Sequence, residues 1–295
     1  DGYWDKGMPY LDAIRILIIP DTDVRIALLR TAEVELVYPP EVSPSHIPMI
    51  ERSPGLRLER RQGVATAMLQ FNIVKPPYDS KALRLGIAHA IDRDKFIQAA
   101  VPGIAQPAFT AIGTGWGYNP DLKPVKFDLG KSREYMAQAG YATKGARIPI
   151  GCASGGQWLQ WCEIFQAILA DAGIQTDVVL IQEGDYWLLD KGFRGRVGFG
   201  PTRFALRVEP DLMLRYMAHS QGSHPLEMRW PRNAELDGLI DEAATIYDVP
   251  KAKLLYDKIQ KIVAEEALYA FVAWADRLAA MSKGVQGFVF YPDTW

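Results

Sequence analysis

Cysteine and histidine are scarce in this chain, whose 295 residues include two cysteines and four histidines. Two cysteines are too few for a disulfide framework. The histidines have neither an HExxH spacing nor cysteine partners at the spacing of a zinc site. His219 and His224 flank a polar segment, residues 221–223, where we expect an exposed loop with both histidines solvated. The sequence therefore predicts no metal centre and no cofactor.

Net charge and long apolar runs are equally limited. The net charge is −2, which gives no reason to expect nucleic acid or an anionic membrane as a partner. No apolar run approaches the roughly 20 residues that span a bilayer as a helix. Apolar residues still make up 48% of the chain. That is enough for a sizeable core, and the length allows two domains.

Motifs of catalysis are also missing, since there is no GxSxG elbow, P-loop or Rossmann signature. Residues 113–117 (GTGWG) are rich in glycine, but a YNP sequence follows them instead of a helix whose N-terminus would hold phosphate. We interpret this stretch as a flexible loop at the mouth of a cleft. Asp92 and Asp94 resemble an acid pair, yet we expect them to end one helix and cap the next, with Arg93 neutralising them. These patterns argue against an enzyme.

The most informative stretch is residues 70–96, QFNIVKPPYDSKALRLGIAHAIDRDKF. An apolar run ends at Asn72, and the double proline at 76–77 fixes two φ angles and excludes helix just before it. Apolar residues then recur at the helical positions 83, 87 and 91. This pattern predicts a strand that leaves one sheet, crosses a stiff connector and enters a helix of another unit. We expect Asn72 to satisfy backbone groups there and not to contact a ligand.

A clear α/β unit follows in residues 147–199. We expect a strand at 147–152, a helix at 157–172 ended by Gly173, a strand at 174–181, a helix at 185–191 and a strand at 196–199. This alternation predicts a mainly parallel sheet covered by helices. Ligands of such sheets lie at the carboxyl ends of the strands, a position that residues 154–156 (SGG) occupy here.

Capping residues and apolar periodicity predict the remaining elements. The further strands are expected at residues 14–19, 56–62, 65–72, 269–273 and 279–282, and the further helices at residues 22–30, 128–139, 212–218, 234–247 and 251–266.

Four segments, in this order, resemble the family 5 extracellular solute-binding proteins, which include the dipeptide, oligopeptide and nickel binders of ATP-driven importers. Residues 1–37 are similar to the family's YW..G.PYLD element, although Ala32 stands where a glycine is usual. Residues 70–96 are similar to the segment that crosses between lobes. Residues 118–141 resemble the run from GY-PDL to AGY, and residues 233–266 resemble the closing helical pair.

The resemblance implies an α/β, two-lobed fold of the periplasmic-binding-protein type II. Residues 1–76 would be a partial lobe I, residues 77–283 a nearly complete lobe II, and residues 284–295 a return segment toward lobe I. It also implies a periplasmic or extracellular, membrane-anchored protein that captures a small solute and delivers it to ABC permease subunits. Family members carry a long preceding segment with the export signal, so we expect this chain to be a fragment of a longer protein.

The expected solute follows from one departure from the family pattern. Peptide-binding members carry a W..D...P arrangement whose aspartate pairs with the α-ammonium group of the peptide. Counting back from Pro210, Arg203 stands at the tryptophan position and Leu206 at the aspartate position. Leu206 would line an apolar wall of the ligand site or pack in the core. Arg203 and Arg207 would instead hold a carboxylate, phosphate or sugar acid, unless Arg207 pairs with a neighbouring acid and faces solvent. We therefore expect an opine, sugar or organic acid, with a peptide or a sensor-linked role as alternatives.

Further ligand contacts are expected at Trp116, Gln157, Trp158, Tyr186 and Phe204. Gln157 and Trp158 open the helix after the strand that ends at residue 152, and Tyr186 begins the next predicted helix. Aromatic planes suit sugars, aryl rings and peptide side chains alike. Trp158 also fits the apolar stripe of its helix, which leaves a core role open.

The two cysteines lie in the same α/β unit. Cys152 ends a predicted strand and Cys162 lies in the following helix. A bridge between them is sterically possible, but we expect two buried, inert thiols.

Overall fold

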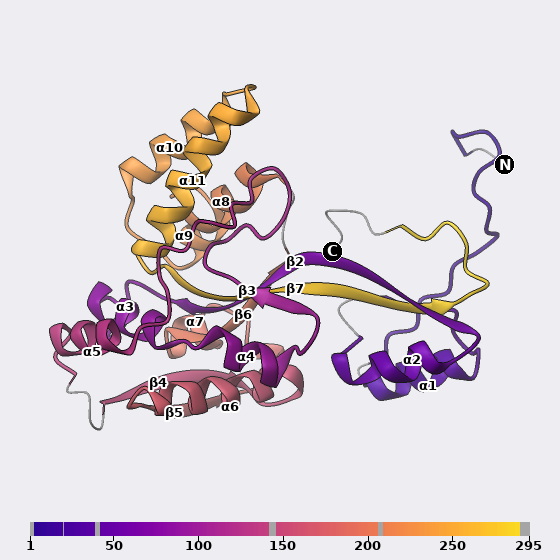
Figure 1. The fold of residues 1–295 in the computed structure, drawn as a ribbon, viewed down its shortest axis with the longest axis horizontal. Coiled ribbons are helices and arrows are strands. Elements are labelled where there is room, and N and C mark those ends of the chain that lie inside the picture. The colour runs from indigo at the N-terminus through magenta and orange to yellow at the C-terminus, as the bar shows by residue number, and fades with distance from the viewer. Residues whose placement is uncertain (1–2, 20, 39–41, 142–145, 206–208, 290–295) are drawn as a thin grey trace. The chain divides into compact units, whose positions relative to one another are not determined.

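The computed structural model describes residues 3–19, 21–38, 42–141, 146–205 and 209–289. The chain forms two compact units, residues 1–59 with 278–287 and residues 60–277 with 288–295. The long strands β2 (Leu56–Phe71) and β7 (Tyr269–Ser282) contribute residues to both units (Figure 1). No helix within the described ranges is long and apolar enough to cross a membrane. The lobe boundary expected at residue 76 stays a prediction, since a compact unit is not by itself a lobe.

The smaller unit contains short elements: α1 (Thr22–Arg30), β1 (Leu36–Val37), the 3-10 helix η1 (Pro44–His46) and α2 (Ile47–Arg52). The α1 helix begins and ends where the sequence predicts, and the side chain of Asp21 caps it by accepting a bond from the Val24 N–H. β1 pairs antiparallel with the end of β7. The strand predicted at residues 14–19 is wrong, because this segment pairs with no other strand in the described part of the chain.

The main sheet has the strand order β1–β7–β2–β6. β6 (Phe199–Ala205) pairs antiparallel with β2, and β3 (Ala105–Pro107) pairs antiparallel with β7. The prediction of a mainly parallel sheet is therefore wrong. The alternation of strands and helices is a local signal, whereas these partners lie far apart in the chain. β2 and β7 were each predicted as two separate strands, and each is continuous.

The predicted α/β unit is present as a two-stranded parallel sheet. β4 (Ala146–Ala153) pairs with β5 (Ile174–Ile181), and α6 (Gly156–Asp171) connects them. Gly173 ends this connection with a φ of +85°, a conformation that a residue with a Cβ rarely adopts. The helix predicted at residues 185–191 is wrong: the segment contains the 3-10 helix η2 (Glu183–Asp185) and turns, and the next helix is α7 (Phe193–Arg196).

The remaining helices follow their predicted positions within a few residues, except α9, which forms where a loop is predicted, and five of them begin at a capping side chain, as expected. Their bounds are α3 (Lys81–Ala90), α4 (Arg93–Ala100), α5 (Leu129–Gln138), α8 (Pro210–Ala218), α9 (Ser223–Glu227), α10 (Ala234–Ala244) and α11 (Val249–Glu265). Asp92 caps α4 as predicted. The buried guanidinium of Arg93 donates to the carbonyls of Ala108 and Phe271, and its charge interacts favourably with that of Asp94.

Two predicted loops are packed instead of open. His219 and His224 are buried, at 6% and 0% exposure, because α9 folds the segment between them against the body of the unit. The glycine-rich stretch is fixed by Gln260 of α11, which donates to the Gly117 carbonyl and accepts a bond from the Ile112 N–H. A Cβ at Gly113 would lie 2.4 Å from the Trp274 ring, so the glycine permits close packing there.

Candidate functional site

An aromatic cluster lies where β4 ends and α6 begins. Trp158, in the first turn of α6, has its ring centroid 5.0 Å from that of Trp187 and 5.3 Å from that of Trp161, both in edge-to-face geometry. Its ring stacks more loosely on Tyr186, at 6.3 Å. Trp158 is only partly buried and packs against an apolar core that includes Phe193. The cluster therefore presents a partly exposed indole ring on a rigid base.

A cation lies over this ring. The guanidinium carbon of Arg203 is 5.8 Å from the centroid of the Trp158 ring, within the range of a cation–π interaction. Arg203 belongs to β6 and stands opposite Ala67 of β2, so a paired strand holds its backbone. An aromatic plane and a guanidinium side by side suit a ligand with a flat or apolar body and an anionic group.

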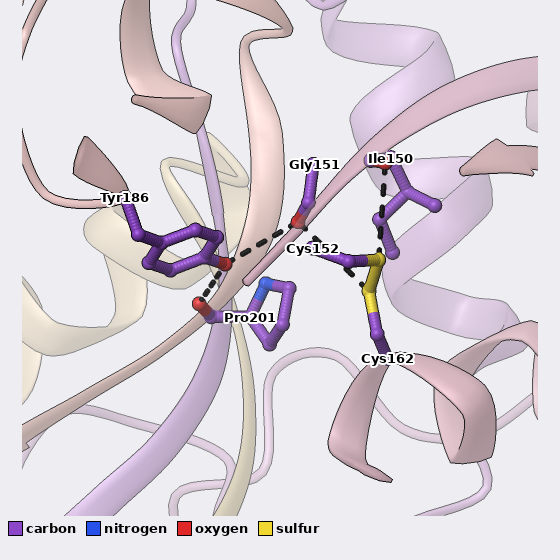
Figure 2. Close-up of a disulfide and its surroundings, with 6 residues drawn as sticks. All are labelled: Ile150, Gly151, Cys152, Cys162, Tyr186 and Pro201. Carbon is purple, nitrogen blue, oxygen red and sulfur yellow. Dashed lines mark hydrogen bonds between the residues drawn. A yellow bond between two sulfur atoms is a disulfide. The ribbon is translucent and has the colours of Figure 1, made fainter. Parts of the chain in front are cut away.

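Tyr186 packs against Trp158 of the cluster, and its hydroxyl reaches toward β4 and β6 (Figure 2). Its side chain is fully buried, and its hydroxyl donates to the carbonyl of Pro201 at 2.7 Å and lies 3.3 Å from that of Gly151. Burial raises the pKa of this phenol above its usual value, so it stays protonated and remains a donor. The hydroxyl contacts β4 and β6, and the expectation that Tyr186 also contacts the ligand stays a prediction.

The two cysteines form a disulfide, and the expectation of two free thiols is wrong (Figure 2). Cys152 is in β4 and Cys162 is two turns into α6, with their Cα atoms 5.9 Å apart, a normal separation for a bridge. The helix packs directly over the strand that precedes it, and this tertiary contact brings the two sulfurs together. The bridge fixes α6, and with it Trp158, to β4.

Phe204 belongs to a different group of residues, because neighbours in a strand point to opposite faces. Its ring lies 4.4 Å from the imidazole centroid of His224 and 6.2 Å from the ring of Tyr269. Behind it, Arg194 donates to His224 Nε2 at 3.2 Å, and His224 Nδ1 lies 2.9 Å from the Tyr269 hydroxyl. Burial, followed by the charge of Arg194, lowers the pKa of His224 to about 2. His224 is therefore neutral, accepting at Nε2 and donating from Nδ1.

The structure thus brings together three of the predicted site residues, namely Trp158, Tyr186 and Arg203. Gln157 is exposed in the first turn of α6, next to Trp158 in the chain. Trp116 instead packs edge-to-face on Tyr256 of α11, at 5.4 Å between centroids. Leu206 and Arg207 lie outside the described residues, so their expected roles stay predictions.

Sequence reasoning missed the buried Arg194–His224 group. Trp187, which follows Tyr186, is a further cleft candidate from the sequence, and the structure places it in the aromatic cluster. The pairing of Arg194 with His224 joins α7 to α9, and no local pattern indicates it. Among the described residues there is no group of three or more histidines, cysteines or acids placed to hold a metal ion.

Comparisons with a family model and with individual proteins point to the same family. Residues 1–199 match the model of the bacterial extracellular solute-binding proteins, family 5 Middle. Heme-binding protein A of Haemophilus influenzae is 28% identical over 298 residues, covering 99% of this chain and 54% of that protein. The glutathione-binding protein GsiB of Escherichia coli strain K12 is 25% identical over 300 residues, covering 99% of this chain and 58% of GsiB.

Solved structures agree on the fold. The periplasmic binding protein DppA from Helicobacter pylori, in complex with the peptide STSA, matches with a TM-score of 0.80 and 25% identity over 91% of this chain and 52% of DppA. AgaA from A. tumefaciens R10, in complex with agropinic acid, matches with a TM-score of 0.81 and 23% identity over 97% of this chain and 58% of AgaA.

This chain spans about half the length of the relatives that it matches. Its mixed α/β fold is that of periplasmic binding proteins, as the resemblance implies. The chain belongs to the bacterial extracellular solute-binding proteins of family 5, which are binding proteins and not enzymes.

Proposed function

We propose that the chain is part of the solute-binding component of an ABC importer, and that its solute carries an anionic group and is not a peptide with a free amino terminus. The protein would capture this solute by non-covalent contacts and deliver it to the permease. The family supports the transport role. The choice of solute rests on one observation, the guanidinium of Arg203 held over the Trp158 ring.

That observation matters because of where Arg203 stands in the sequence. Peptide-binding members are expected to place a tryptophan at this position and an aspartate three residues later, which would be Leu206 here. An α-ammonium group needs a carboxylate to offset the cost of losing its hydration. A fixed cation would repel the ammonium, whereas it would attract a carboxylate, phosphate or sugar acid. The Trp158 ring would then pack against the apolar face of the same ligand.

A peptide is the second candidate, and two relatives favour it. GsiB is named for glutathione and DppA was solved with a peptide, each at 25% identity to this chain. Heme-binding protein A has a chemically different ligand, so the family alone does not select one. A peptide would need an ammonium contact that Arg203 does not provide.

The experiment is native mass spectrometry of the whole protein purified from its own host, followed by calorimetric titration with the molecule that co-purifies. We expect the co-purified molecule to be anionic, such as an opine, an organic acid or a sugar acid. Arg203→Ala should weaken its binding by about tenfold or more, equivalent to about 1.4 kcal/mol. Arg203→Lys should recover part of that loss, because it keeps the charge but not the fork geometry.

Arg147→Ala is the matched control. Arg147 is an exposed arginine on β4 that pairs with Asp177, so removing it should leave the affinity unchanged. A co-purified peptide, or an affinity that Arg203→Ala does not alter, would contradict the proposal and favour the second candidate.

A further inference from the structure

The strand β5 has an open edge. It pairs in parallel with β4 on one side, and no other strand in the described part of the chain pairs with its second side. The Ser154 N–H donates to the Ile181 carbonyl at 2.8 Å, so Ile181 directs its backbone groups toward β4. Successive residues of a strand direct their N–H and C=O groups to opposite edges. Thr176, Val178 and Leu180 therefore direct theirs away from β4, where they can pair with a further strand.

The side chains along this edge are exposed and mostly apolar. Val178 and Leu180 lie on the same face of the strand and are 37% and 58% exposed. The sequence of β5, IQTDVVLI, contains none of the prolines or lysines that commonly protect an open edge. Its one charged residue, Asp177, pairs with Arg147 of β4. The edge is therefore close to neutral, which favours pairing with another strand of low charge.

A second copy of β5 complements this edge in one register. Directly opposed residues of an antiparallel pair either both bond across the interface or both point away from it. Around a two-fold axis, the two registers that meet this condition and pair nearly the whole strand place the axis at Asp177 or at Val178. The first sets two Asp177 carboxylates directly opposite each other, which is destabilising. The second sets Val178 opposite its own copy and Leu180 opposite Thr176, without opposing like charges.

We propose that β5 pairs antiparallel with β5 of a second copy about a two-fold axis at Val178, and that the chain forms a weak homodimer in this way. About six backbone hydrogen bonds would join the two strands. Val178 and Leu180 would become buried, and Asp177 would keep its partner Arg147. Because the pairing uses the open edge of both copies, assembly ends at two. The dimer does not depend on which solute the protein binds.

Hydrogen exchange of the whole protein, resolved to single amides, tests this pairing. At about 1 µM protein the amides of Thr176, Val178 and Leu180 should exchange freely, whereas those of Asp177 and Val179, which bond to β4, should be protected. An interface of one strand is small, so we expect a dissociation constant on the order of 100 µM. At several times that concentration the three outward amides should exchange at least about threefold more slowly, and sedimentation equilibrium should show a dimer.

Two substitutions act on different parts of the pairing. Val178→Lys sets two ammonium groups opposite each other at the axis and should weaken dimerisation by about tenfold or more. Thr176→Pro removes an outward N–H that β4 does not use, a position where an edge strand tolerates proline, and should weaken dimerisation as well. Leu254→Lys is the matched control, since Leu254 is an apolar residue of α11 that is 71% exposed. It should leave the dissociation constant unchanged.

Several results would overturn the proposal. One is a protein that stays monomeric while its outward amides exchange freely at high concentration. Another is protection of these amides already at about 1 µM, because a different part of the whole protein would then cover the edge. A dimer that neither Val178→Lys nor Thr176→Pro weakens would have its interface elsewhere. Growth beyond two copies would exclude a closed two-fold pairing.

Discussion

Loss of the Cys152–Cys162 disulfide should measurably destabilise the larger unit. The bridge joins β4 to α6 across a sequence separation of 10 residues. Both cysteines are buried, so the folded state holds the two sulfurs in contact with or without the covalent bond. The effect of the bridge is therefore expected mainly in the unfolded chain, whose conformational freedom it restricts.

The magnitude follows from the size of the closed loop. For about ten residues the chain-entropy relation gives about 2.7 kcal/mol of stabilisation at 25 °C. In a folding unit of about 150 to 250 residues this corresponds to a fall in Tm of roughly 5 to 11 °C. The unfolded chain should also become less compact, which raises the m-value of urea unfolding.

The assay is equilibrium unfolding in urea with and without reductant, combined with a double-mutant cycle. If the bridge is present, Cys152→Ala, Cys162→Ala and the double variant should each lose a similar stability, because either single change breaks the same bond. If the thiols are free, the two single losses should add in the double variant.

One result would refute this reasoning directly. Protein purified from an oxidising compartment, then denatured without reductant, should contain no titratable thiol. Two titratable thiols, together with an unfolding curve that reductant leaves unchanged within about 0.5 kcal/mol, would show that the bridge does not form.

Three further outcomes are expected in the same larger unit. The folded pKa of His224, about 2, lies below the usual value in the unfolded chain. The contribution of His224 to the free energy of unfolding is therefore complete above about pH 6.5 and is lost as the pH falls. Below that pH the free energy of unfolding should drop by up to about 1.4 kcal/mol per pH unit. Unfolding measured at several pH values should show a smaller slope for the His224→Gln variant. Gly200→Ala places a Cβ 2.6 Å from the Gly151 carbonyl oxygen and should cost about 1 to 3 kcal/mol by urea unfolding. Gly238→Ala, in α10 with no atom within 4 Å of the new Cβ, should instead stabilise by up to about 1 kcal/mol, and a loss there would contradict this account.

Local signals in the sequence predicted the longer helices well, whereas they gave a helix at residues 185–191 that does not form and missed the short helix α9. The caps Asp21, Asp92 and Asp128 lie where helices begin, and Gly173 lies where the chain turns into β5. Such features act within one turn of backbone, so a single sequence contains them completely. The parallel β4–α6–β5 unit was predictable for the same reason, since its strands and helix follow one another directly.

Pairings between distant segments could not be predicted in this way. The partners of β2 and β7 lie far away in the chain, and nothing in either strand specifies an antiparallel neighbour. The burial of His224 depends on α7 and Tyr269, which the local polar sequence does not reveal. For the site, the sequence indicated Trp158 and Arg203 separately. Their cation–π contact required the fold that brings α6 to β6.

The hydroxyl of Tyr186 has a consequence for how the larger unit unfolds. It lies within hydrogen-bonding distance of one carbonyl of β4 and one of β6, strands that belong to separate sheets. Pro201 has no N–H, so β6 has no backbone donor to offer β4 at that residue. Separating the sheets would break these contacts of the buried phenol, a cost that falls on the two sheets together. Amide hydrogens of β4 and β6 should therefore exchange as one cooperative group, with the protection of the small parallel sheet rising to that of the larger one.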